Sequence, residues 1–144
     1  GESTTVGKLL ARFGLWDPIR ERAQAGMGIF GTCTGMILLA GARPGESEPR
    51  LGLIDCAVVR NAFGRQIDSF ETELAIPVLG DSPFPAVFIR APYLAAPGRE
   101  VEVLATLEEK IVLARQGRIL ACAFHPELTK DLRLHRYFLD LLLK

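Results

Sequence analysis

The sequence has few cysteines and histidines, and these small numbers exclude several kinds of site. Its 144 residues include three cysteines, Cys33, Cys56 and Cys122, and two histidines. The odd cysteine count, without a CxxC pair or a spacing typical of metal ligands, argues against a disulfide framework and against a zinc site. We therefore expect no metal, and a reduced, cytoplasmic compartment.

Long apolar runs and an excess of charge of either sign are also missing. No apolar run approaches the roughly 18 residues that a membrane-spanning helix requires. The 17 basic residues balance the 17 acidic ones. No basic run alternates with aromatic residues, as it does in many nucleic-acid-binding proteins. We therefore expect neither a nucleic acid nor a membrane among the partners.

The composition that remains is that of a folded domain. Hydrophobic residues make up 49% of the chain and charged residues 24%, which is not a disordered composition. This length fits a single domain over residues 1–144. Patterns of strand and helix alternate early and become mostly strands between about 51 and 113. We expect an α/β fold in which helices flank a mostly parallel central sheet, with an antiparallel excursion over that middle part.

Caps, glycines and periodicity place the expected elements. Ser3 or Thr4 can cap a first helix that closes at Gly14 and has an apolar stripe on one face. Asp17 can cap a second helix, and an amphipathic pattern predicts a last helix over 131–143. The expected strands are 51–60, part of 68–79, 86–90, 101–107, 110–115 and 118–124, with a loop over 92–98.

The most informative stretch is residues 27–40. It begins as an apolar run with strand character, passes through a turn of small residues around Cys33, and resumes with helical spacing. This is the layout of a nucleophile elbow, a sharp strand-to-helix turn that presents a reactive side chain. Gly31 and Gly35 flank the cysteine, and we expect that Cβ atoms at both positions would clash. The nearby helix N-terminus is expected to lower the pKa of the thiol.

A nucleophilic cysteine needs a base, and the base needs an orienting group. His125 and Glu127 directly follow the apolar run 119–124, which predicts a central buried strand. Alone, His-Pro-Glu is more often an ordinary turn after a strand, but its combination with the elbow favours a catalytic set of Cys33, His125 and Glu127. Cys56 and Cys122 are interpreted as buried apolar residues, and His135 as a residue on the surface of the last helix.

Acyl chemistry also needs hydrogen-bond donors for a developing oxyanion. The backbone N–H of Thr34, directly after the cysteine, is one candidate, and the segment 1–3 is the other. Arg60 and Arg90 each end an apolar strand. Their side chains can either turn into a cleft or remain solvated, and the pattern leaves both alternatives open.

Several segments resemble one enzyme family. Segments 31–40 and 125–128 resemble the triad regions of class I glutamine amidotransferases. Segments 1–5, 60–71, 88–92 and 121–128 are similar to the glutaminase subunits of pyridoxal 5'-phosphate synthase, and the likeness runs the whole length. The block from Arg60 to Glu71 separates these subunits from other amidotransferases.

The resemblance implies a class I glutamine amidotransferase-like three-layer fold and a glutaminase. Such an enzyme hydrolyses L-glutamine and passes ammonia to a barrel-shaped synthase subunit for the synthesis of pyridoxal 5'-phosphate (vitamin B6). In this family Cys33 would form a glutamyl thioester, His125 would move protons, and Glu127 would orient His125. The hydrolysis itself implies no cofactor.

The same resemblance implies the substrate contacts. Gly1, Glu2 and Ser3 correspond to a glutamine-binding segment, and Gly1 would serve the oxyanion hole together with Thr34. Arg60, Ile89 and Arg90 correspond to further glutamine contacts.

The family's usual strand–helix–strand unit, about 30 residues or more, precedes the point that corresponds to Gly1. We therefore expect the chain to be N-terminally truncated relative to the family, with a charged amino group at Gly1 and an unpaired sheet edge. One alternative is a catalytically silent domain with only a binding role. Another is a cysteine peptidase on the same elbow, which leaves the Arg60 block without a role.

Overall fold

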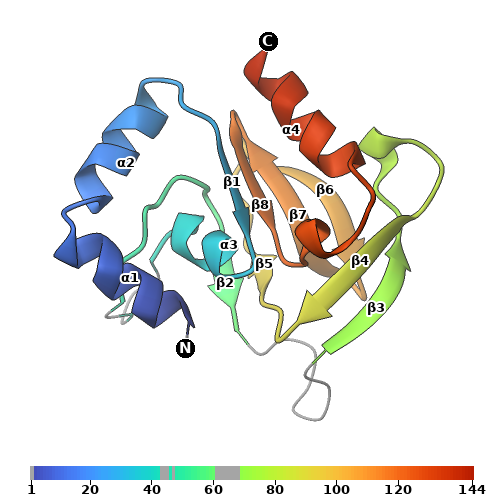
Figure 1. The fold of residues 1–144 in the computed structure, drawn as a ribbon, viewed down its shortest axis with the longest axis horizontal. Helices are drawn as coiled ribbons and strands as arrows, with labels where there is room; N and C mark the ends of the chain where they lie inside the picture. The colour runs from blue at the N-terminus through green and yellow to red at the C-terminus, as the bar shows by residue number, and fades with distance from the viewer. Residues whose placement is uncertain (1, 43–45, 47, 61–68) are drawn as a thin grey trace.

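The computed structural model describes residues 2–42, 46, 48–60 and 69–144 (Figure 1). Within these residues the helices are α1 (Glu2–Arg12), α2 (Trp16–Gln24), α3 (Thr34–Leu39) and α4 (Arg133–Leu142), with short 3-10 helices η1 (Pro77–Leu79) and η2 (Pro126–Leu128). The strands are β1 (Ile29–Thr32), β2 (Ala57–Val59), β3 (Ser69–Leu74), β4 (Phe84–Ile89), β5 (Tyr93–Ala95), β6 (Glu102–Leu107), β7 (Lys110–Gln116) and β8 (Ile119–Cys122).

The larger sheet of the described residues has the strand order β1-β8-β7-β5-β2, and β6 pairs with β7. Strands β1 and β8 are parallel, with Thr32 opposite Cys122. The other strand pairings in this sheet are antiparallel, and β3 and β4 form a separate antiparallel ribbon. The expectation of a mostly parallel sheet is therefore wrong for the described strands. Two-residue turns at 108–109 and 117–118 join β6 to β7 and β7 to β8, and turns that short can join only antiparallel neighbours.

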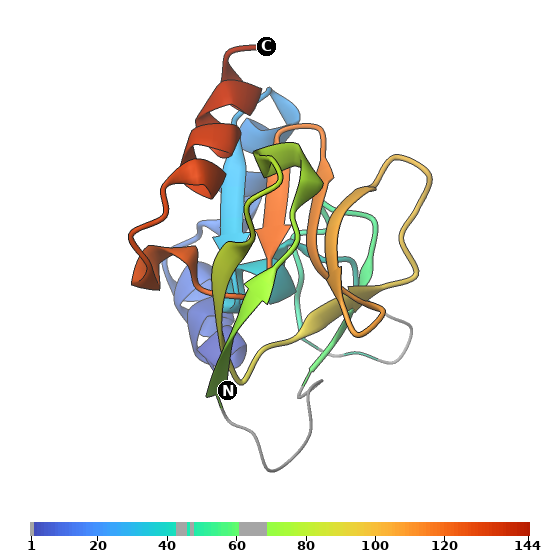
Figure 2. The same cartoon turned by 90° about the vertical axis from the view of Figure 1, so that its right-hand side faces the viewer.

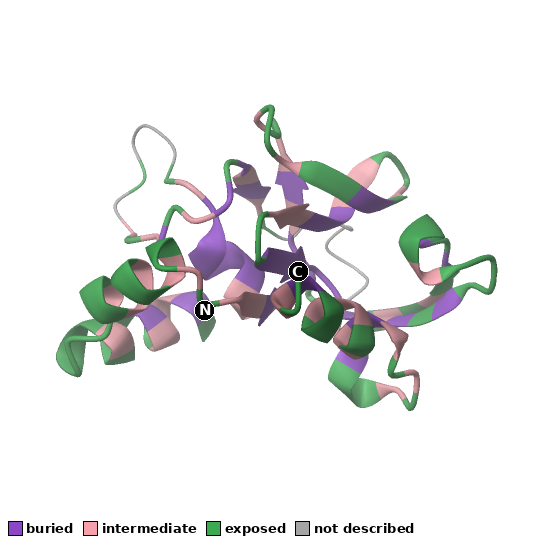
Figure 3. Cartoon of the chain, turned by 90° about the horizontal axis from the view of Figure 1, so that it is seen from above, coloured by how far each residue is buried: buried purple, intermediate pink, exposed green. Residues whose placement is uncertain are grey.

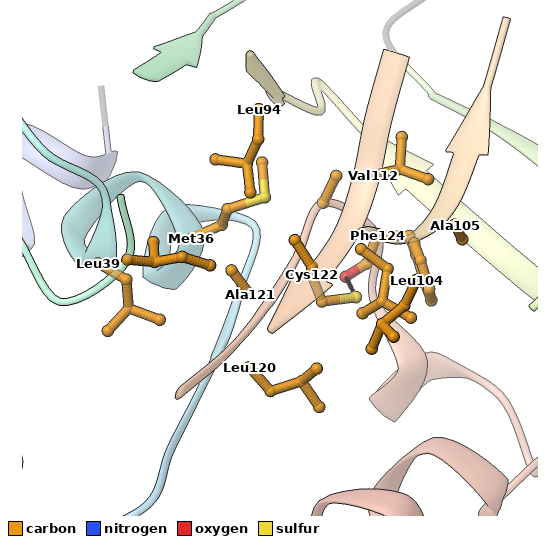
Figure 4. Close-up of a cluster of buried hydrophobic side chains, with 14 of the residues drawn as sticks. Met36, Leu39, Leu94, Leu104, Ala105, Val112, Leu120, Ala121, Cys122 and Phe124 are labelled. Carbon is orange, nitrogen blue, oxygen red and sulfur yellow. Dashed lines mark hydrogen bonds between the residues drawn. The ribbon is translucent and has the colours of Figure 1, made fainter. Parts of the chain in front are cut away.

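The elements form the expected layered α/β arrangement. Helices α1, α2 and α3 lie on one side of the larger sheet, and α4 and the β3–β4 ribbon lie on the other (Figures 1 and 2). Burial is concentrated on the sheet and on α3, whereas the outer helices are largely exposed (Figure 3). Figure 4 shows part of this core, in which Met36 and Leu39 of α3 belong to one buried cluster with Leu94, Leu104 and Phe124.

The first two helices differ from the expectation at their starts and in the face that they bury. Helix α1 begins at Glu2, so Ser3 and Thr4 lie inside its first turn and do not cap it. Asp17 likewise lies within α2 rather than before it. The buried residues of α1 are Ser3 and Gly7, because the indole of Trp16 packs on Gly7 and donates to its carbonyl at 3.2 Å.

The middle of the chain confirms some expected strands and changes others. Strand β3 alternates in burial as expected, and α4 buries Leu134 and Leu141 on its apolar face. The expected strand over 51–60 is reduced to the three residues of β2. Residues 93–95, expected in a loop, form β5, because they pair with β2 on one side and with Ile111 of β7 on the other. That pairing depends on distant residues, which local patterns do not contain.

Candidate functional site

The turn between β1 and α3 is the expected elbow, and its backbone is strained at the cysteine. Cys33 has φ of 51° and ψ of −103°, in a region that residues with a Cβ rarely adopt. A Cβ added at Gly31 would lie 2.7 Å from the backbone carbon of Gly35, so glycine is required at 31. A Cβ added at Gly35 would meet no described atom within 4 Å, so the expected clash there is wrong. The close approach is one-sided, because the backbone of Gly35 fills the space above Gly31.

The sulfur of Cys33 is buried, and this reverses the expected direction of its pKa shift. The residue is 9% exposed, and its Sγ donates to the carbonyl of Ile89 at 3.8 Å. Burial raises the pKa of the Cys33 thiol, because a thiolate loses hydration there. The backbone N–H of Thr34 opposes this rise in pKa, while the carboxylates of Glu2 and Glu127 add to it. The thiol therefore needs a base, because the hydrogen bond from the Thr34 N–H does not outweigh desolvation.

His125 and Glu127 form a direct contact of the kind that orients a base. Nδ1 of His125 lies 2.8 Å from Oε2 of Glu127. An ionised carboxylate can only accept, so Nδ1 donates to it and Nε2 is left as the basic nitrogen. The contact forms through the short helix η2, which contains Glu127, and not along an extended segment as expected. A hydrogen bond of this geometry suits a histidine base and the carboxylate that orients it.

The fold brings this pair to the elbow at the carboxyl ends of β1 and β8. The N–H of Cys33 donates to the carbonyl of Cys122 at 2.7 Å, and the chain reaches His125 three residues later. Strand β4 contacts both halves, since Sγ of Cys33 donates to the carbonyl of Ile89 and the N–H of His125 donates to the carbonyl of Val87 at 2.8 Å. These two acceptors are two residues apart on one strand, about 7 Å. The elbow and the His–Glu pair therefore border the same small region.

Comparison with known proteins shows which family the chain belongs to. The model of the SNO glutamine amidotransferase family matches residues 1–144. The chain belongs to this family. It is 64% identical over 140 residues to a pyridoxal 5'-phosphate synthase subunit PdxT from Pelotomaculum thermopropionicum, covering 97% of this chain and 71% of that protein. A PdxT from Moorella thermoacetica is 59% identical over 142 residues, covering 99% of this chain and 76% of that protein.

The chain also resembles solved structures in its fold. A crystal structure described as that of a glutamine amidotransferase superposes with a TM-score of 0.89 at 51% identity, covering 100% of this chain and 76% of that one. A putative GMP synthase component from Thermoplasma acidophilum has a TM-score of 0.59 at 14% identity, covering 91% of this chain and 65% of that one, and shares the fold alone. The class I glutamine amidotransferase-like fold expected from the sequence is thus confirmed.

The expected substrate segment at the start of the chain lies against the elbow. Glu2 accepts a hydrogen bond from Oγ1 of Thr34 at 3.2 Å, which joins the first turn of α1 to the first turn of α3. Ser3 is buried at 4% exposure, and its hydroxyl has no hydrogen-bond partner among the described residues. Gly1 and the segment 61–68 lie outside the described residues. The structure therefore places Glu2 against Thr34 and close to Cys33.

The remaining expected contacts come from two strand ends. Ile89 ends β4, and its carbonyl faces the sulfur, while the following Arg90 has a positive φ of 47° and is exposed. Arg60 follows β2 and pairs through Nη2 with Oε2 of Glu48 at 3.1 Å. The side chain of Arg60 is thus 38% exposed and also paired with a carboxylate of the protein, so both alternatives for Arg60 stay open.

Glu48 is the residue near this site that the sequence did not single out. It lies in a Gly-, Pro- and Glu-rich segment, which predicts only a surface loop. Its importance follows from contacts with Thr4 and Arg60, which are distant in the chain, and with Arg50, two residues away. No local pattern signals them.

Other sequence expectations concern residues outside the elbow. Cys56 and Cys122 are buried, as expected. His135 is not a simple surface residue, because its ring stacks edge-on to Phe30 at 5.6 Å and its Nδ1 is buried without a partner in the described part of the chain. A pocket of about 320 Å³ lies between the β3–β4 ribbon and Leu128, just beyond Glu127.

The described ranges contain neither a candidate membrane-spanning helix nor a candidate metal-binding cluster. No helix there combines the length and apolar character needed to cross a bilayer. Histidine, cysteine, aspartate and glutamate side chains do not gather there in groups of three or more that could hold a metal ion.

Proposed function

We propose that residues 1–144 act as one glutaminase domain of a cytoplasmic pyridoxal 5'-phosphate synthase, hydrolysing L-glutamine and supplying ammonia to the synthase subunit. The observation that carries the proposal is the buried Cys33 in a strained elbow beside the hydrogen-bonded His125–Glu127 pair. The membership of the chain in a glutamine amidotransferase family, and its identity to subunits of that synthase, support the choice of substrate and partner.

In the first half of the reaction Cys33 attacks the side-chain amide of glutamine. The thiol proton passes to Nε2 of His125 as the sulfur bonds to the amide carbon, and the amide oxygen becomes an oxyanion. Collapse of this intermediate breaks the C–N bond, and the proton on His125 passes to the leaving nitrogen, which departs as ammonia. The product on the enzyme is a glutamyl thioester.

In the second half a water molecule hydrolyses the thioester. His125 takes a proton from the water as its oxygen bonds to the acyl carbon, and the C–S bond breaks to release glutamate. The departing sulfur recovers the proton. Glu127 keeps Nδ1 protonated throughout, so that Nε2 faces the reacting atoms, and stabilises the imidazolium that forms in each half.

The oxyanion and the substrate need donors and charges that match them. The N–H of Thr34 is the proposed oxyanion donor, because it lies close enough to the Cys33 sulfur to lower the pKa of the thiol. Gly1 is proposed as a second donor. Glu2, Ser3, Arg60, Ile89 and Arg90 are proposed as glutamine contacts, with the guanidinium groups suited to the α-carboxylate of the substrate.

The test is ammonia release from glutamine with the synthase subunit present. We expect Cys33→Ala to abolish it and Glu127→Gln to lower kcat by about 10²-fold to 10⁴-fold, because the amide no longer fixes the imidazole. Cys56→Ala is the matched control, since it removes a different buried thiol, and should retain the wild-type rate.

A glutamine-analogue electrophile provides a second measurement of the same site. It should attach one label to the wild-type protein and none to Cys33→Ala, as read by intact mass. If the wild-type chain releases no ammonia with its partner and takes no label, the proposal is wrong, and a silent domain with only a binding role is the better description.

A further inference from the structure

Glu48 connects parts of the site that are far apart in the chain. One carboxylate oxygen, Oε1, accepts a hydrogen bond from the Thr4 hydroxyl at 2.5 Å. The other, Oε2, lies 3.1 Å from Nη2 of Arg60 and 3.3 Å from Nη1 of Arg50. Thr4 belongs to the first turn of α1, and Arg60 directly follows β2. A single carboxylate therefore joins the segment that contains Glu2 and Ser3 to the arginine after β2.

Its contacts favour the ionised form of the Glu48 carboxyl group. Its pKa falls from the ordinary 4.5 to about 2, first because of the Thr4 hydrogen bond and then because of the bonds from Arg60 and Arg50. The side chain of Arg50 is only 4% exposed, so its guanidinium provides a fixed positive charge behind the carboxylate. Arg60, at 38% exposure, is the more exposed of the two arginines, and its Nη2 lies 3.1 Å from Oε2 of Glu48.

A guanidinium has five N–H donors in a planar fork, so one bond to Glu48 leaves donors for a substrate carboxylate. Without Glu48, the long side chain of Arg60 would sample several rotamers, and glutamine would have to order it on binding. Preorganisation of this kind improves binding of the substrate more than the chemistry at the sulfur.

We propose that Glu48 is a positioning residue for glutamine, which fixes the Arg60 guanidinium relative to the first turn of α1. This rests on the proposed function, because it assumes that Arg60 binds the substrate. Glu48 does not touch the reacting atoms. Its removal should raise KM for glutamine and leave kcat nearly unchanged.

The test compares two reagents on the full chain, both of which attack Cys33. The diazoketone analogue of glutamine must bind at the substrate contacts before it reacts, whereas iodoacetamide needs only the thiol. We expect Glu48→Gln to slow labelling by the analogue at least about tenfold and to leave alkylation by iodoacetamide unchanged. Glu46→Gln is the control, since Glu46 carries the same charge in the same segment and pairs with Arg50 at 3.9 Å.

Thr4→Val is a second variant, which keeps both arginine contacts of Glu48 and removes only the hydroxyl that holds Oε1. It should also slow labelling by the analogue, by a smaller factor than Glu48→Gln. If Glu48→Gln does not fold, Thr4→Val tests the proposal in its place. Labelling by the analogue at or above the wild-type rate in a folded variant of either kind overturns the proposal. So does an equal loss with both reagents, which would mean a general effect on the sulfur. Failure of the analogue to label the wild-type protein would instead contradict the proposed function.

Discussion

Gly31 is the residue on which the elbow depends most directly, because any side chain there meets the backbone of Gly35. An added Cβ would lie 2.7 Å from the Gly35 carbon, 2.8 Å from its oxygen and 2.5 Å from Cδ1 of Leu39. Two of these atoms are backbone and cannot rotate away. The same turn has the strained φ of 51° at Cys33, which the surrounding structure must hold in place.

Gly31→Ala should therefore lower the free energy of unfolding by about 1–3 kcal/mol, because the turn must open to accommodate the added Cβ. Gly35→Ala is the matched control, since its Cβ meets no described atom and alanine favours a helix by up to about 1 kcal/mol. Urea unfolding of both variants gives the comparison. Equal destabilisation by the two substitutions would contradict the one-sided clash.

At the scale of the element, the turn between β6 and β7 is built from unfavourable residues. Glu108 and Glu109 have φ of 50° and 66°, and Leu107 pairs with Lys110 on either side of them. A two-residue turn with two positive φ values is normally made with asparagine and glycine. The hairpin therefore forms because β7 is held in the sheet from both sides, and not because its turn favours it.

Glu109→Gly should raise the free energy of unfolding by roughly 0.5–1 kcal/mol, because the left-handed backbone costs about 1–2 kcal/mol with a side chain and glycine returns part of this as entropy. Glu100→Gly, at an exposed turn position without a positive φ, should instead destabilise by a similar amount. Thermal unfolding of the two variants separates these outcomes. Destabilisation by Glu109→Gly would show that its side chain contributes more than its backbone costs.

At the scale of the whole molecule, the three thiols share one property that links stability to pH. Burial raises the pKa of Cys33, raises that of Cys56 from 9.0 to about 11, and raises that of Cys122 well above its ordinary value. A group whose pKa is raised by folding favours the folded state below its unfolded pKa, and this contribution is lost as pH rises toward the folded pKa.

Stability should therefore fall between about pH 9 and pH 11. For Cys56 alone, two pKa units correspond to at most about 3 kcal/mol. Differential scanning calorimetry across this range checks the prediction, with Cys56→Ala as the comparison. The variant should lose less stability between the two pH values than the wild-type chain, whatever its stability at neutral pH. An equal loss of stability with rising pH in the two proteins would contradict the raised pKa of Cys56.

Local sequence was sufficient for the parts of the site that depend on a few neighbouring residues. Small residues around Cys33 between a strand pattern and a helix pattern predicted the elbow, and the apolar run before His125 predicted the buried strand β8. The amphipathic pattern of the last helix predicted the face that contains Leu134 and Leu141. Each of these follows from steric limits and periodicity within one element, which the order of residues specifies directly.

Only the tertiary structure decided what depends on distant segments. It paired residues 93–95 with β2 and made the described sheet mostly antiparallel. It also placed the backbone of Gly35 where a Cβ at Gly31 would lie, and left space for a Cβ at Gly35. It buried the Cys33 sulfur, so that desolvation outweighs the hydrogen bond from the Thr34 N–H and raises the thiol pKa. It also placed Glu48 between Thr4 and Arg60. Burial, dielectric and the partners of a charge are set by which surfaces meet, and no single stretch of sequence contains both surfaces.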